Sequence, residues 1–126
     1  MEQDYKGLEV IRAAAALTTA YVAATVTGTH GLSNQLILLV DYTKGASDDM
    51  RLKVEFSSDG TNYYQETMST LSTGVDTTEL LEHKLGASGA YRLVIPIKDQ
   101  FVKVSVKATT SAVNTSCKIT SVIGTA

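Results

Sequence analysis

The stretch Met50–Phe56, with the sequence MRLKVEF, decides the fold class. Its apolar side chains stand at every second position, and Arg51, Lys53 and Glu55 occupy the positions between them. Successive side chains of a β-strand point to opposite faces of a sheet. The alternation therefore predicts a strand with one buried face and one face in water.

Two later segments repeat this alternation. In Phe101–Ala108, FVKVSVKA, we expect the valines and Ala108 to face inward and Lys103, Ser105 and Lys107 to face outward. The segment CKITSVI begins at the chain's one cysteine and places four residues on a single face: Cys117, Ile119, Ser121 and Ile123. We interpret Cys117 as a small buried hydrophobe.

Two other segments are almost continuously apolar. Gln35–Tyr42, QLILLVDY, and Arg92–Ile97, RLVIPI, are short runs of the kind that suits strands buried on both faces. Pro96 has no amide proton for a sheet hydrogen bond, so we expect it at a sheet edge or near the end of a strand.

Polar and glycine-containing breaks separate these segments, so that strands recur every eight to fifteen residues. The breaks are Gly28–Asn34, Lys44–Asp49, Ser72–Thr77 and Gly86–Gly89. This rhythm predicts an all-β fold, a single-domain antiparallel sandwich or barrel. We place its domain at residues 8–126, after a short N-terminal arm at residues 1–7.

Two regions leave alternatives open. Leu8–Ala16 is rich in alanine, which favours helix, yet its neighbours favour strand, so we expect two strands in the N-terminal third. Thr77–Leu85, TTELLEHKL, fits a short helix capped by Thr77 or Thr78, and it fits a strand followed by a loop equally well.

Composition excludes several classes of protein. The chain has 126 residues and a formal net charge of −2, and its eleven Lys and Arg residues are scattered, so we expect no nucleic-acid binding. The acidic start MEQDYKG lacks the pattern of a signal peptide, and no run approaches the length of a membrane span. A single cysteine allows no internal disulfide, which fits assembly in a reducing compartment.

The sequence contains no recognisable catalytic, metal or cofactor motif. His30 and His83 lie in or beside expected loops, and we interpret both as solvated residues; Glu79 and Glu82 lie close to His83 in sequence. The acidic residues Asp41, Asp48 and Asp49 surround a glycine-containing loop, but their spacing matches no calcium motif, so a cation there stays an open alternative. We therefore expect no enzymatic activity and no cofactor.

The stretch FSSDGTNYYQE, Phe56–Glu66, predicts a hairpin. Asp59-Gly60 supplies the positive φ angles that a tight two-residue turn needs. Tyr63 and Tyr64 follow it, and because neighbours in a strand point to opposite faces, we expect one to pack inside and the other to be exposed.

The segment from Gln35 to Ile123 resembles a group of small virion proteins of tailed bacteriophages. The matching residues are Ser57–Tyr64, which fits a pattern S-x-D-G-T-x-W/Y-Y, then Tyr91-Arg92, then the Val-rich strand within 101–109. The sequence departs from that pattern with Tyr63 in place of the common Trp and with a longer polar insert at Ser69–Thr78. The resemblance implies a jelly-roll-like sandwich that assembles on the virion.

On this basis we expect a non-enzymatic structural protein, foremost a capsid decoration protein that self-associates, as a trimer, and stabilises the shell. Its partners would be copies of itself and the major capsid protein or another virion protein, with no nucleic acid and no membrane. The alternatives are a tail, head-completion or fibre component, and a carbohydrate- or receptor-binding module. Candidate partner contacts are Tyr5, Lys6, Tyr63 and Tyr64.

Overall fold

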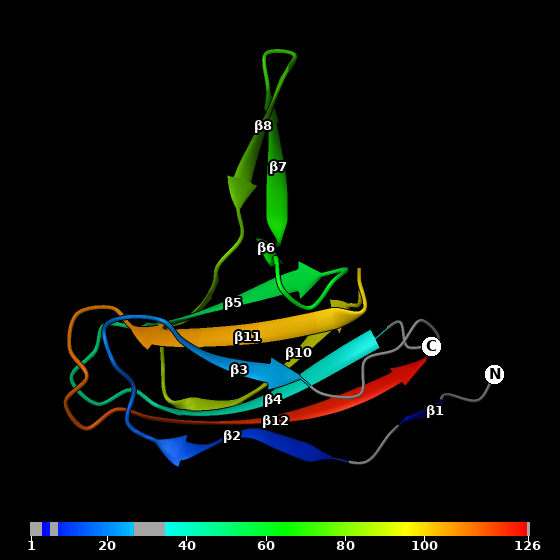
Figure 1. The fold of residues 1–126 in the computed structure, drawn as a ribbon. Coiled ribbons are helices and arrows are strands. Elements are labelled where there is room, and N and C mark those ends of the chain that lie inside the picture. The colour runs from blue at the N-terminus through cyan, green and yellow to red at the C-terminus, as the bar shows by residue number, and fades with distance from the viewer. Residues whose placement is uncertain (1–3, 6–7, 27–34, 126) are drawn as a thin grey trace.

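The computed structural model describes residues 4–5, 8–26 and 35–125, and within these ranges it contains twelve β-strands and no helix (Figure 1). The strands are β1 (Asp4–Tyr5), β2 (Glu9–Ala15), β3 (Val22–Val26), β4 (Gln35–Thr43), β5 (Met50–Ser57), β6 (Tyr64–Gln65), β7 (Thr67–Ser72), β8 (Val75–Leu80), β9 (His83–Leu85), β10 (Gly89–Pro96), β11 (Phe101–Ala108) and β12 (Ser116–Thr125).

Two antiparallel sheets lie face to face and form the body of the protein (Figure 1). The first sheet has the order β2-β12-β4-β10, and β1 shares the edge of β12 with β2. The second has the order β3-β11-β5-β9, and β6 shares the edge of β5 with β9. Leaving out the two short strands β1 and β6, eight strands form these two sheets, and the chain passes from one sheet to the other after each of them except between β5 and β9. This is the strand order of a jelly roll, the kind of sandwich that the resemblance implied.

The core lies between the two sheets and is built from alternate residues of each strand. In the second sheet Val54 of β5 lies opposite Val104 of β11, and Leu52 lies opposite Val106. All four side chains are at most 1% exposed. Burying one such side chain stabilises a fold by about 1.5–3 kcal/mol. The inward faces expected for Met50–Phe56, Phe101–Ala108 and Cys117–Ile123 are confirmed.

The two continuous apolar runs differ in their surroundings. Ile37 and Leu38 of β4 are adjacent and both buried, so the expected burial on both faces is confirmed at this point of the strand, whereas Asp41 and Thr43 near its end are exposed. The same expectation is wrong for Arg92–Ile97, because Val94 is 43% exposed while Ile95 is buried. The reason is that β10 is the edge strand of the first sheet. Pro96 is the last residue of β10, as expected for a residue without an amide proton.

Three further expectations meet the structure in different ways. The N-terminal third forms two strands, β2 and β3, as expected, and the helical alternative for Thr77–Leu85 is wrong, since that segment lies in β8 and β9. Ser105 lies on the outward face as expected but is buried there, because it is a small side chain on a central strand between Ala23 and Lys53. Cys117 is fully buried as expected, and burial raises the pKa of its thiol to about 11.

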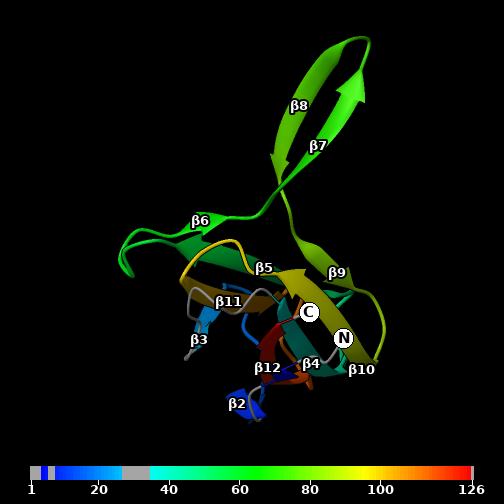
Figure 2. The same ribbon diagram turned by 90° about the vertical axis from the view of Figure 1, so that its right-hand side faces the viewer.

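A hairpin formed by β7 and β8 projects from the body as a separate two-stranded sheet (Figures 1 and 2). It contains the whole polar insert, Ser69–Thr78, that distinguishes the sequence from the virion proteins. The break expected at Ser72–Thr77 is thus wrong in extent, because the turn consists only of Thr73 and Gly74. Both have positive φ, 48° and 78°, which is the geometry of a tight type I′ turn.

The loop Lys44–Asp49 packs on the connection before β12. The amide of Ala46 donates a hydrogen bond to the carbonyl of Val113 over 2.9 Å. Gly45 has a φ of +57°, and a Cβ on it would lie 2.5 Å from the backbone of Val113 and Asn114. Only glycine fits there, because the backbone of another loop takes the space of a side chain.

We predict that Gly45→Ala destabilises the fold more than Gly60→Ala, whose φ of +76° is similar. At Gly60 the new Cβ meets only the Phe101 ring at 3.4 Å, so the expected loss is the strain alone, about 1–2 kcal/mol. Gly45→Ala adds a collision with backbone and should cost clearly more. Urea denaturation measures both variants, and equal losses would contradict this account of the loop.

Candidate interaction site

Asp59 organises the loop between β5 and β6. Its Oδ1 accepts hydrogen bonds from the amides of Thr61 and Asn62, both over 2.8 Å, and from the hydroxyl of Ser57 over 2.9 Å. Its Oδ2 accepts one from the side-chain amide of Asn62 over 2.9 Å. These donors stabilise the carboxylate and hold the pKa of Asp59 well below its usual range.

The prediction of a two-residue turn at Asp59-Gly60 is wrong. Six residues separate the end of β5 at Ser57 from the start of β6 at Tyr64, and of these only Gly60 has positive φ. The amide of Gly60 donates to the Ser57 hydroxyl over 2.9 Å. Asp59 serves this longer loop as a hydrogen-bond acceptor, a role that Asp also has in turns.

The two tyrosines after this loop both lie outside the core. Tyr63 is half-buried, and the ammonium group of Lys103 lies 4.2 Å from the centre of its ring. Tyr64, in β6, is 74% exposed. The expectation of one exposed tyrosine is confirmed for Tyr64, whereas the expected inward tyrosine is wrong: Tyr63 contacts a lysine on the outer face of the second sheet. The expected alternation of inward and outward side chains does not hold here, because β6 is only two residues long.

The N-terminal contacts remain predictions. The backbone of Tyr5 pairs with Gly124 in β12, so Asp4–Tyr5 of the expected arm lies along the first sheet. Lys6 and His30 lie outside the described residues.

Glu66 joins the hairpin to the body. Its amide donates to the carbonyl of Val54 over 3.0 Å, and its own carbonyl accepts the amide of Leu81 over 2.8 Å. Its carboxylate Oε1 lies 3.3 Å from Nε2 of His83. His83 is therefore half-buried at the start of β9, and the solvated-loop interpretation is wrong. The partner of His83 is Glu66, and not Glu79 or Glu82, which shortly precede it in sequence.

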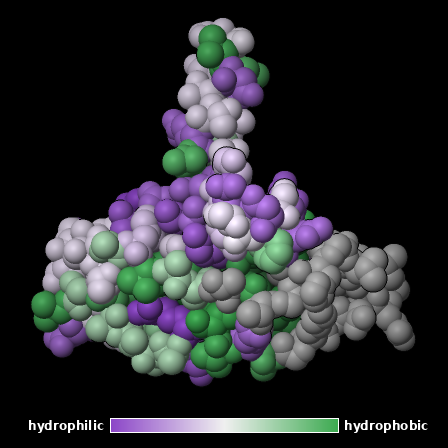
Figure 3. Space-filling view, viewed as in Figure 1, coloured by the Kyte–Doolittle hydropathy of each residue, from purple (hydrophilic) through white to green (hydrophobic). Residues whose placement is uncertain are grey.

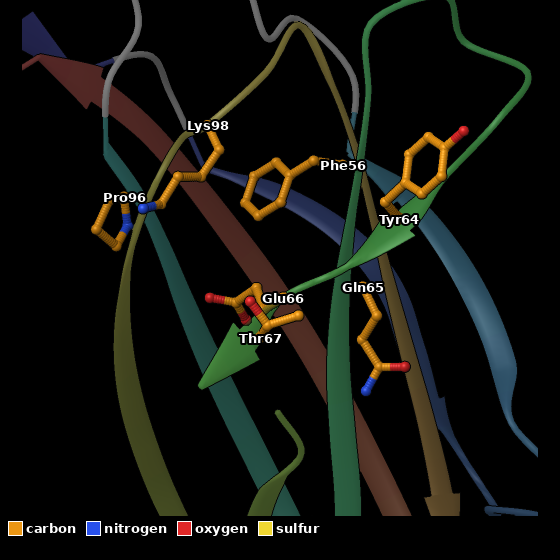
Figure 4. Close-up of a pocket in the computed structure, with 7 residues that line it drawn as sticks. All are labelled: Phe56, Tyr64, Gln65, Glu66, Thr67, Pro96 and Lys98. Atoms are coloured by element: carbon orange, nitrogen blue, oxygen red, sulfur yellow. The ribbon is translucent and has the colours of Figure 1, made fainter. Parts of the chain in front are cut away.

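A pocket of about 490 Å³ opens beside this junction (Figure 4). The ring of Phe56 lies between Lys98 and Tyr64, and Gln65, Glu66, Thr67 and Pro96 complete the lining. Its walls combine two aromatic rings and a proline with a carboxylate, an amide and an ammonium group. Such a mixture suits a polar ligand with one apolar face or a protruding side chain of another protein.

The three acidic residues around Lys44–Asp49 do not form a cation site. Asp49 is 5% exposed; its Oδ1 lies 2.9 Å from Nε of Arg51, and its Oδ2 lies 3.7 Å from Nζ of Lys84. The Arg51 guanidinium lowers the pKa of Asp49. Asp41 and Asp48 are exposed. Among the described residues, no group of three or more His, Cys, Asp and Glu side chains is placed to hold a metal ion.

A cluster of polar contacts around Tyr21, on the outer face of the second sheet, was not predicted from the sequence. The hydroxyl of Tyr21 donates a hydrogen bond to Glu82, and the ammonium groups of Lys53 and Lys107 lie 4.5 and 4.9 Å from the centre of the Tyr21 ring. Partial burial and Glu82 raise the pKa of Tyr21. Because Tyr21 and Glu82 are 61 positions apart in the sequence, no local sequence pattern predicts this contact.

Comparisons with known proteins assign the chain to no family. No family model matches the sequence, and no curated protein matches it. One similar solved structure is a chain of the disulfide-linked pili that form Bacillus endospore appendages. It is 9% identical, with a TM-score of 0.48, and the alignment covers 99% of this chain and 90% of that one. A likeness this weak carries no argument about function.

We predict that Asp59 makes stability depend on acid pH. A carboxylate with a lowered folded pKa stabilises the fold above its unfolded pKa of about 3.9, and this contribution is lost as pH falls through the folded pKa. Wild type should therefore be more stable than Asp59→Asn at pH 7, and the difference should shrink below about pH 4. Urea midpoints at pH 7 and pH 2.5 measure it; a constant difference would contradict the role of the ionised group.

We predict that Asp49→Asn destabilises the protein by about 2 kcal/mol, because a buried acceptor of charged donors is lost. The neighbouring exposed Asp48 provides the matched control, and Asp48→Asn should change stability by less than about 0.5 kcal/mol. Thermal or urea unfolding gives both values. Added calcium should leave the melting temperature of wild type unchanged; a rise that Asp49→Asn abolishes would restore the cation interpretation.

Proposed function

We propose that this chain is a non-enzymatic structural protein that assembles with copies of itself. The observation that carries the proposal is the hairpin of β7 and β8, in which all twelve residues are exposed. Four of them are large apolar residues with exposures from 43% to 73%: Met68, Leu71, Val75 and Leu80. A two-stranded hairpin is at best marginally stable alone in water, so contact with another chain is what this element needs.

A second apolar surface supports the same proposal. On the outer face of the first sheet, Val94 of β10 lies beside Ile37 of β4, and Val122 of β12 lies on the other side of Ile37. Val94 is 43% exposed, and Val10 of β2, which pairs with Thr120 beside this row, is 52% exposed. In Figure 3, hydrophobic residues gather over the lower part of the body, whereas the hairpin shows single hydrophobic residues among polar ones. Exposed apolar surface of this kind typically marks contact with another protein.

The more specific part of the proposal is that the assembly decorates and stabilises a bacteriophage capsid, as the resemblance at Ser57–Tyr64 implies. Trimers fit this role because closed cyclic symmetry is usual for homo-oligomers and threefold positions are common on capsids. Many weak contacts repeated by symmetry would then stabilise the shell through avidity. Tail, head-completion and fibre positions remain the nearest alternatives. The part of the chain that the structure describes holds no helix long and apolar enough to cross a membrane.

The pocket at the hairpin base favours one further candidate, a carbohydrate- or receptor-binding module. Tyr64 offers an exposed ring beside the polar groups of Gln65 and Glu66, which is a setting in which sugars stack on aromatics. A single exposed ring is a small platform, so this candidate ranks second. Binding on a glycan array that Tyr64→Ala abolishes would favour it over the structural role.

We expect sedimentation equilibrium of the purified protein to give a mass that corresponds to several chains, with three as the expected number. The same protein should co-sediment with capsids that lack their decoration. A strict monomer at all concentrations that also leaves capsids unbound would overturn the proposed function.

A further inference from the structure

The hairpin has one edge that lacks the usual protection against pairing. In the described part of the chain β7 pairs only with β8, so its other edge carries backbone groups free for a further strand. Proteins usually protect such edges with charged residues, proline or bulges. Thr67–Ser72, TMSTLS, has none of the charged residues and no proline, and it pairs with β8 in a regular register.

The opposite edge of the hairpin is protected by charge. β8 contains Asp76 and Glu79, and both are exposed. Two copies that met through β8 would bring four carboxylates together, and like charges across a strand pair are destabilising. Two copies that met through β7 would bring together only threonine, serine, methionine and leucine side chains. The charge pattern therefore selects β7 as the edge that a second copy can approach.

We propose that β7 pairs antiparallel with β7 of a second copy, about a two-fold axis at Ser69, so that two hairpins form one four-stranded sheet. This inference rests on the proposed self-association and names the surface that performs it. The contact joins copies in pairs, so in an assembly with threefold contacts it links one trimer to the next.

Side-chain pairing favours an axis at Ser69 over one at Thr70. In a symmetric antiparallel pair the two-fold axis is normal to the sheet and passes between the two copies of one residue. Each residue and its symmetry mate then lie on the same face of the sheet. With the axis at Ser69, Leu71 lies opposite Thr67 of the second copy, and Met68 lies opposite its Thr70. With the axis at Thr70, both apolar side chains lie opposite serines. Threonine offers a methyl group to each apolar side chain, which makes the first register the better packed.

Single cysteines test both the edge and the register. Directly opposite residues of an antiparallel pair have Cα atoms about 4.5–5.5 Å apart, within reach of a disulfide. We expect Ser69→Cys to form a disulfide-linked dimer under mild oxidation. Thr70→Cys should not, because it lies diagonally from its own mate, beyond about 7 Å. Thr78→Cys, which pairs with Ser69 inside the hairpin but lies on β8, should not either. The native Cys117 is fully buried and stays silent.

A charge substitution tests the same edge without a crosslink. We expect Thr70→Lys to weaken self-association by at least about tenfold, because each new lysine then lies opposite the apolar Met68 of the second copy, and the two ammonium groups stand diagonally on the same face. Thr77→Lys faces Thr70 within the hairpin but belongs to β8, and it should leave association unchanged. All these positions are exposed, so the variants are expected to fold.

The outcomes separate this inference from the proposed function. If wild type is an oligomer but Ser69→Cys fails to crosslink and Thr70→Lys associates normally, the β7 contact is wrong and self-association stands. Crosslinking of Thr70→Cys in place of Ser69→Cys would overturn the register, and equal crosslinking of Thr78→Cys would overturn the choice of edge. A monomeric wild type would overturn the proposed self-association itself.

Discussion

The pairing of β12 with β4 is the contact on which the rest of the fold depends. It joins the end of the chain to its middle over nine residue pairs, from Ser116 opposite Thr43 to Gly124 opposite Gln35. β2 and β1 then pair with the free side of β12, and β10 pairs with the free side of β4. Every other element of the first sheet is thus placed by these two strands, and their inward side chains meet the valine rows of β5 and β11 in the core.

The same dependence explains how much of the fold could be read from the sequence. A strand with one face in the core must alternate apolar and polar residues along its sequence. For this reason the inward and outward faces of β5, β11 and β12 were predicted correctly. β7 and β8 pack on nothing in the described chain, so nothing forces their side chains to alternate, and the stretch TMSTLS showed no strand signal. The turn signal misled for a related reason: Asp-Gly is typical of tight turns, but the tight turn is at Thr73-Gly74, where sequence preference is weaker.

The candidate site was predictable only in part. The adjacency of two tyrosines predicted that one ring would be exposed, which is Tyr64, but it did not predict the position of Tyr63, because a long loop and Lys103 determine it. The contacts of Glu66 with His83, and of Tyr21 with Glu82, join residues brought together by sheet pairing alone. A cation near Asp49 stayed an open alternative because the sequence did not reveal that Arg51 and Lys84 neutralise the buried carboxylate.

The hairpin and the body also differ in how quickly they can form. The contacts of β7 with β8 are all local, from Ser72 opposite Val75 to Thr67 opposite Leu80, and hairpins of this kind form in about 1–10 μs. The jelly roll must bring β4 together with β12 across most of the chain, and β-rich folds with such distant pairing take about milliseconds to seconds. An uncharged strand edge therefore belongs to the fastest-forming part of the chain. If two hairpins pair through this edge, the order in which the two parts form during synthesis determines whether they meet before or after the body is complete.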